Sequence, residues 1–174
     1  MKRYFFMEQD NTLMDVIGLR DFDIYGTRHI FTIEDADSIN DITVLYIDED
    51  KGECAPDFIK SPVYMISEMG WKVINMYEDD LISKKIVMIY KEEERQLTYF
   101  NLLLREIEAL HETTEYYPNG MAKRMVLSRD KIGDHKAFLL EDSKIKLPVV
   151  SQEVAESLLR RHVMGVTFNE IEVI

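Results

Sequence analysis

Short extended segments are the clearest pattern along this chain. Residues 42–47 (ITVLYI) and 85–90 (KIVMIY) are rich in β-branched and apolar side chains, a composition that favours strands. Residues 3–8 and 125–128 show the same character more weakly. Residues 21–25 alternate acidic and apolar side chains, which is the pattern of a half-exposed strand. These segments predict a protein with several short strands.

A helix is predicted after the extended segment LPVV, close to the end of the chain. Ser151 can cap this helix, because its hydroxyl can accept from the free backbone N–H groups of the first turn. Glu153 in the first turn and Arg160 near the last suit the helix dipole. Four apolar side chains at helical spacing form one stripe along it, namely Val154, Ala155, Leu158 and Leu159. We expect Gly165 to end this helix.

A second helix is predicted at Ser67, which follows the extended segment VYMI. Gly70 weakens it by about 1 kcal/mol relative to alanine. Its apolar side would contain Met69, Val73, Ile74, Met76 and Tyr77. The segments PVYMISE and PVVSQE both place a serine where a strand ends and a helix begins. This similarity predicts either an internal repeat or a chance match of a short pattern.

Several segments are less clearly defined. Residues 97–104 (LTYFNLLL) suit either a strand or the start of a helix, and residues 105–111 are expected to complete one or two helical turns. Residues 117–120 (YPNG) predict a turn. Residues 166–173 predict a final strand whose alternation breaks near Asn169. The succession predicts an α+β fold, with a mixed or mostly antiparallel sheet and two or three short helices packed on one side.

Length and composition favour one folded domain over residues 1–174. We divide it into an acidic part rich in strands and loops, residues 1–55, and a core, residues 56–174, that closes with a strand–helix–strand unit. Cys54 is the one cysteine in the sequence, so an internal disulfide is impossible and a reducing compartment is expected. The first ten residues do not have the pattern of a signal peptide, and no segment is long and apolar enough to span a membrane. We therefore expect a cytoplasmic protein.

Negative charge is concentrated in the first third of the chain. The formal net charge is −12, which argues against binding nucleic acid through its phosphates. Residues 1–58 carry 14 acidic and 5 basic side chains, whereas residues 59–174 carry 19 and 16. This asymmetry indicates either a solvated acidic surface or one that attracts a basic protein partner. The candidate contact residues are Asp21, Asp23, Glu34, Asp35, Asp37, Asp48, Glu49 and Asp50.

The sequence contains no catalytic, cofactor or metal signature. Asp48, Asp50 and Glu53 partly match a calcium loop, but glycine and glutamate stand in the wrong places. The segment HETTE has glutamate where a zinc protease helix needs its second histidine. Phosphate-binding glycine loops and the GxSxG motif are missing from the sequence. We therefore predict no catalytic residues, no cofactor and no bound metal.

The order of these segments resembles a family of bacterial immunity proteins from polymorphic toxin systems. It is the family numbered eleven among immunity proteins, formerly a domain of unknown function. The likeness covers about residues 56–174 and consists of core and capping residues: Asp57-Phe58, Ser67, Tyr99-Phe100-Asn101-Leu102, Phe138-Leu139-Leu140, Val150-Ser151 and Gly165-Val166-Thr167-Phe168.

This resemblance implies a cytoplasmic protein that is not an enzyme and that binds and neutralises a cognate toxin by forming a protein–protein complex. The net charge and the lack of a long apolar segment predict no nucleic-acid and no membrane partner, and the oligomeric state stays open. Two other classes stay open from the residues alone. One is a hydrolase-like enzyme whose carboxylates meet only in the fold, which predicts a pocket with acids of raised pKa. The other is an oligomerising structural module, which predicts an apolar patch shared between identical chains.

Overall fold

The computed structural model describes residues 2–20, 31–79, 81–141, 143–144 and 146–174. Over these ranges it contains fourteen strands and four short helices, which confirms the α+β class. The helices are η2 (Ile33–Ser38), α1 (Glu68–Asn75), α2 (Arg129–Ile132) and α3 (Gln152–Arg160). The strands are β1 (Tyr4–Gln9), β2 (Gly18–Arg20), β3 (Ile42–Asp48), β4 (Phe58–Ile59), β5 (Met65–Ser67), β6 (Ile82–Tyr90), β7 (Arg95–Leu103), β8 (Glu106–Ile107), β9 (Glu115–Tyr116), β10 (Ala122–Arg124), β11 (Val126–Leu127), β12 (Ala137–Leu140), β13 (Val149–Ser151) and β14 (Val166–Val173).

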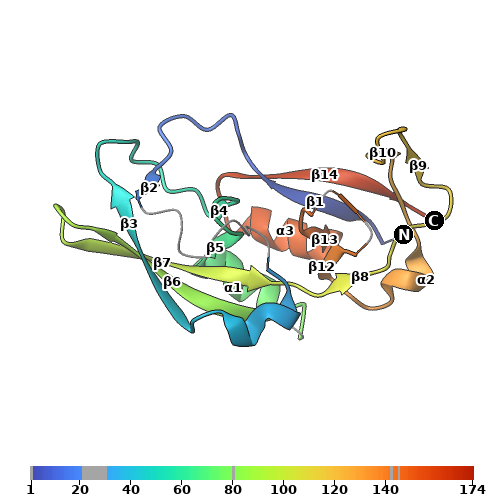
Figure 1. Cartoon of the computed structure of the whole chain (residues 1–174), viewed down its shortest axis with the longest axis horizontal. Helices are drawn as coiled ribbons and strands as arrows, with labels where there is room; N and C mark the ends of the chain where they lie inside the picture. The colour runs from blue at the N-terminus through green and yellow to red at the C-terminus, as the bar shows by residue number, and fades with distance from the viewer. Residues whose placement is uncertain (1, 21–30, 80, 142, 145) are drawn as a thin grey trace.

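The strands form two six-stranded sheets and one small hairpin. The first sheet has the order β2-β3-β6-β7-β5-β4, and the second has the order β11-β14-β1-β13-β12-β8. Figure 1 shows the β6–β7 hairpin at one end of the molecule and both chain termini at the other. The strand β1, from the acidic first part of the sequence, therefore lies in the middle of a sheet built mostly from the last third of the chain.

The two sheets contain the same five-stranded unit. In unit 1 the order is β3-β6-β7-β5-β4, and in unit 2 it is β11-β14-β1-β13-β12. The first pair of each unit, β3–β6 and β11–β14, is parallel, and all the following pairs are antiparallel. Each unit also places a helix, α1 or α3, directly after its fourth strand in this order. Unit 2 differs in that its β1 comes from the beginning of the chain and in that α2 lies between β11 and β12.

The strand register gives the correspondence residue by residue. Ser67 pairs with Tyr99 in unit 1, and Ser151 pairs with Tyr4 in unit 2. Both serines cap their helices as predicted, since their hydroxyls accept from the N–H groups of Gly70 and Val154, respectively. The two similar sequence segments around Ser67 and Ser151 therefore occupy equivalent positions in the two units.

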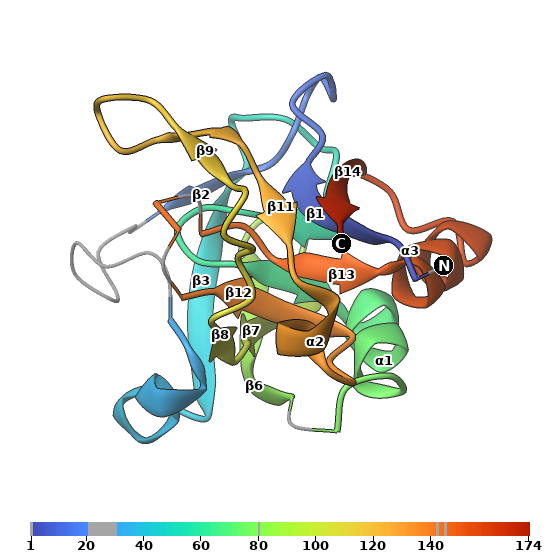
Figure 2. The same ribbon diagram turned by 90° about the vertical axis from the view of Figure 1, so that its right-hand side faces the viewer.

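Each sheet has apolar side chains on both faces. A central core lies between the two units and receives both α1 and α3, which lie side by side in Figure 2. A separate core lies on the opposite face of each sheet. This explains the break near Asn169: Val166 and Phe168 contact the central core, whereas Ile171 and Val173 point to the other face.

Three local predictions need correction. Residues 105–111 do not form helical turns, because β8 pairs with β12 and the N–H of Leu139 donates to Arg105 O. The helix α3 ends at Arg160, and His162 already has a positive φ of 56°, so the helix stops before Gly165. The predicted apolar stripes are too wide, since they include four exposed side chains, Leu159, Met69, Met76 and Tyr77.

Gly70 is needed for close packing in unit 1, although it weakens the helix. A Cβ at this position would lie 2.5 Å from Cγ1 of the fully buried Ile66. Gly70→Ala is expected to lower the free energy of unfolding by about 1 kcal/mol, because the clash outweighs the gain in helix propensity. Urea denaturation measures the change, with Asn75→Ala on the exposed side of α1 as the control. Equal stability of Gly70→Ala and wild type would contradict the argument.

Candidate partner-binding surface

The predicted acidic residues fall into two groups at opposite ends of β3. Asp21 and Asp23 lie outside the described residues. Glu34, Asp35 and Asp37 lie on η2, before β3 begins. The remaining three, Asp48, Glu49 and Asp50, lie at its end. The structure therefore separates what the sequence presented as one acidic surface.

The second group belongs to an acidic tip. Strands β3 and β6 are parallel, so the turn after β3 lies beside the β6–β7 turn. Glu49 accepts a hydrogen bond from the backbone N–H of Glu92, at 3.1 Å, which joins the two turns. We call this group the tip cluster; its carboxylates are Asp48, Glu49, Asp50, Glu92, Glu93 and Glu94.

The tip cluster is only partly neutralised within the chain. Asp48 forms ion pairs with Arg20 and Lys51, and Glu93 forms one with Arg95 at 2.9 Å. Lys91 lies over the ring of Tyr46, 4.2 Å from its centroid. Six acidic and four basic side chains therefore meet here, and most of them are exposed. The cluster keeps an excess of negative charge.

Two residues of the first group, Glu34 and Asp35, line a pocket of about 390 Å³ together with Thr32, Glu106 and Glu141. Asp35 is used locally, since its carboxylate accepts from the N–H of Thr32 at 2.8 Å and completes a capping box. Lys146 donates to Glu106 at 2.6 Å. Glu34 and Glu141 are exposed. The pocket is acidic, but much of its charge serves to hold η2 and β8.

An uncovered apolar face lies between the two acidic groups. On β3 the buried residues alternate with Ile42, Val44 and Tyr46, and Ile42 and Val44 are 59% and 43% exposed. In the register with β6, Val44 lies beside Val87, and Tyr46 lies beside Ile89. We call this surface the open face, defined by Ile42, Val44, Tyr46, Val87 and Ile89.

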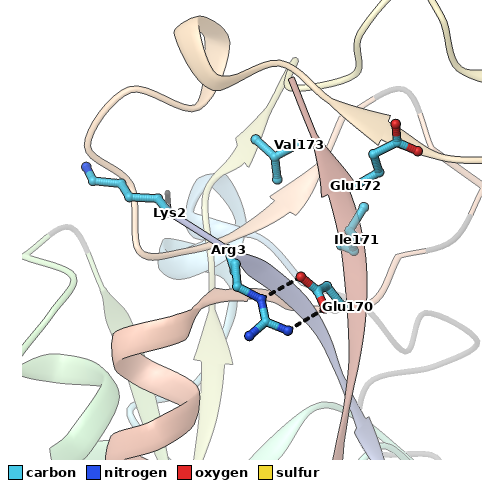
Figure 3. A pocket seen from close by; sticks show the side chains of 6 residues that line it. All are labelled: Lys2, Arg3, Glu170, Ile171, Glu172 and Val173. Atoms are coloured by element: carbon cyan, nitrogen blue, oxygen red, sulfur yellow. Dashed lines mark hydrogen bonds and ion pairs between the residues drawn. The ribbon is translucent and has the colours of Figure 1, made fainter.

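Another pocket lies where β1 and β14 meet near the chain termini. It has a volume of about 520 Å³ and is lined by residues 2–3 and 170–173. Figure 3 shows that Arg3 makes two hydrogen bonds to Glu170, from Nε and from a terminal nitrogen. Its described lining residues include no serine, cysteine or histidine. Its groups therefore suit an ion pair between strands better than nucleophilic catalysis.

Glu78 and His135 form a partly buried acid–histidine pair. The imidazole Nδ1 lies 3.0 Å from Glu78 Oε1, while Oε2 accepts from the N–H groups of Lys136 and Ala137 at 2.7 and 3.1 Å. The pocket beside them, of about 260 Å³, contains no serine, threonine or cysteine among its described lining residues. This carboxylate therefore serves to tie the end of α1 to the start of β12.

The pKa shifts show no sign of an acid catalyst among the described carboxyl groups. The Arg3 guanidinium donates to Glu170 and lowers its pKa, and the Lys84 ammonium has the same effect on Asp41. A general acid at neutral pH needs a raised pKa instead. Every described carboxyl group with a clear shift has a lowered pKa: Asp10, Asp41, Glu68, Glu108, Glu153, Glu156 and Glu170.

The two weak metal motifs have local structural roles. Asp48, the first residue of the calcium-like segment, pairs with cations on its own sheet. His111, which opens HETTE, contacts the hydroxyl of Thr113 through Nδ1 at 2.8 Å. Over the described ranges, no group of three or more histidine, cysteine or acidic side chains is arranged to hold a metal ion.

Neither family models nor curated proteins match this chain. None of the helices in the part of the chain that the structure describes has the length and apolar character to cross a bilayer. The surface itself must therefore support any functional argument.

Sequence reasoning missed two parts of the surface. Glu92, Glu93 and Glu94 are adjacent acidic residues in the sequence, but only the β3–β6 pairing brings them to Glu49. The open face was also missed, because ITVLYI predicts only an apolar strand, without an exposed side. Ile42 and Val44, at alternate positions of this strand, are exposed because α1 covers β5 and β7 instead. The sequence does not show which part of the sheet a helix covers.

Proposed function

We propose that this protein is a cytoplasmic immunity-type protein that binds a cognate, basic protein toxin and neutralises it by forming a complex. The observation that carries the proposal is the exposed tip cluster, which holds more acidic than basic side chains at one end of a rigid sheet. A fixed field of this sign accelerates encounter with a cationic partner and disfavours acidic ones. The resemblance of residues 56–174 to immunity family eleven agrees with this role.

The enzyme alternative receives less support from the site chemistry. Its expected feature is a pocket in which acids with raised pKa values converge. The described carboxyl groups with a clear pKa shift have a lowered pKa instead. The described residues that line the pocket beside Glu78 and His135 include no serine, threonine or cysteine that could act as a nucleophile. A complex that blocks a toxin needs no reacting group of its own.

The test is neutralisation of the toxic C-terminal domain encoded by the neighbouring gene. Co-expression of this chain is expected to restore growth of cells that produce that domain, and the purified proteins are expected to form a stable complex in calorimetry. A neighbouring locus without such a domain, or the absence of complex formation by the wild-type chain, would refute the proposed function.

Charge reversal tests the contribution of the tip cluster. The triple variant Glu49→Lys, Glu92→Lys and Glu93→Lys is expected to reduce the association rate about tenfold at low salt and to flatten its salt dependence. The matched control reverses Glu112, Asp130 and Asp134, which are exposed and lie outside unit 1. Both variants have the same net charge, so an equal loss in stopped-flow kinetics would mean that only total charge matters.

A further inference from the structure

The open face is the side of β3 and β6 that points away from the core on the opposite face of this sheet. Leu45 and Met88 supply the buried side of β3 and β6, and both are almost fully inaccessible. The opposite side chains, Val44 and Val87, lie side by side in register and remain accessible to water. Burial of such apolar area against a partner is favourable, and the isolated chain does not realise this gain.

Unit 2 provides an internal comparison for this surface. Tyr99 of unit 1 and Tyr4 of unit 2 are equivalent, because each pairs with the serine that caps the helix of its unit. On the strand at their other side, Tyr99 pairs with Ile86 and Tyr4 pairs with Ile171, so these two isoleucines correspond. One position further along each strand, Val87 corresponds to Glu172.

The neighbouring strand shows the same contrast. Val44 pairs with Val87 in unit 1, and Val126 pairs with Glu172 in unit 2, so Val44 corresponds to Val126. Two residues earlier on the same strands, Ile42 therefore corresponds to Arg124. Arg124 and Glu172 form hydrogen bonds of 2.6 and 3.0 Å on the surface. Unit 2 therefore exposes an ion pair at the positions of Ile42 and Val87, and it buries Val126, the equivalent of the exposed Val44.

The negative charge beside the open face indicates which kind of partner would fit this surface. The Tyr46–Ile89 row ends next to the tip cluster, where Glu49 and Glu92 are hydrogen-bonded together. Of the two nearby lysines, Lys91 lies over the ring of Tyr46, whereas Lys85 pairs with Ile42 at the end of the open face that is away from the tip cluster. An apolar centre with an acidic border fits a partner with an apolar centre and a basic border.

A second copy of this chain fits this surface less well. Each copy has a net charge of −12, and association of two copies would bring these charges together. Interfaces commonly have an apolar, desolvated centre that contributes most of the affinity, surrounded by a polar rim.

We propose that the open face is the desolvated centre of the contact with a basic protein partner, and that the tip cluster is its rim. This inference rests on the proposed function, because it identifies where on the chain the toxin binds. It assigns affinity mainly to Val44 and Val87, and association rate mainly to the tip cluster.

The test uses the double variant Val44→Glu and Val87→Glu with the neighbouring toxin domain in calorimetry. The added negative charge favours encounter with a basic partner, yet loss of the apolar centre is expected to weaken binding at least 30-fold. The control is Leu159→Glu, which alters an exposed apolar residue on α3. It is expected to bind as wild type does, and thermal unfolding monitors the fold of all three proteins.

The outcomes separate the two proposals. Binding of the double variant with wild-type affinity would overturn the open-face assignment and leave the proposed function intact. Failure of the wild-type chain to bind would overturn both. A wild-type dimer in analytical ultracentrifugation that becomes monomeric in the double variant would show that a second copy covers the face, and would likewise overturn the assignment.

Discussion

Removal of residues 2–9 is expected to prevent unit 2 from folding. These residues contain β1, which lies between β14 and β13 and pairs with both. Its loss would leave two strands without their partner and would remove the buried side chains of Tyr4 and Met7 from two different cores. Circular dichroism and the dispersion of amide NMR signals are expected to show loss of the native fold.

A circular permutant distinguishes loss of the strand from loss of its place in the sequence. β14 and β1 are antiparallel neighbours that correspond to β6 and β7, which a short turn connects in unit 1. A short linker from Ile174 to Lys2, with new termini in the turn at residues 117–120, would make the same hairpin in unit 2. This permutant is expected to fold. If the permutant does not fold but the variant without residues 2–9 does, the description of two equivalent units would be wrong.

Replacement of Glu78 by alanine is expected to lower the free energy of unfolding by about 3 kcal/mol. Its carboxylate is nearly inaccessible and accepts from Lys136 N–H, Ala137 N–H and the His135 ring. Truncation would leave two backbone donors without an acceptor where α1 meets β12, and a hydrogen bond to a charged group contributes about 1.5–3 kcal/mol. Urea denaturation gives the change.

Two further variants show whether this effect comes from the acceptor oxygens. Glu78→Gln keeps one oxygen for the backbone donors and is expected to lose less stability than Glu78→Ala. Asp134→Ala changes an exposed acid in the same pocket and is expected to change stability by less than about 0.5 kcal/mol. If all three variants are equally stable, the carboxylate does not hold the two elements together.

The candidate surface was only partly visible in the sequence. Excess charge identified Asp48, Glu49 and Asp50, because a dense acidic run can be seen without knowledge of the fold. The partners of these residues, Glu92 and Glu93, lie more than forty positions away and meet them through parallel pairing of β3 and β6. Sequence spacing gives no signal for such a contact.

The sequence by itself determined the local elements that depend on nearest neighbours. The two serine caps, the strand over residues 42–47 and the turn at residues 117–120 follow from hydroxyl acceptors, β-branched side chains and turn residues. Where most side chains of a segment are apolar, as in residues 97–104, either a strand or a helix satisfies the local pattern. This segment forms the strand β7 because its backbone pairs with β5 on one side and with β6 on the other, both antiparallel.

Only the tertiary structure decided how these elements combine. The duplicated units, the central position of β1 and the uncovered side of β3 all depend on hydrogen bonds between strands that are distant in the sequence. Backbone N–H and C=O groups are alike in every residue, so strand order is selected by the packing of whole faces against one another. That selection buries Leu45 and leaves its neighbour Val44 exposed.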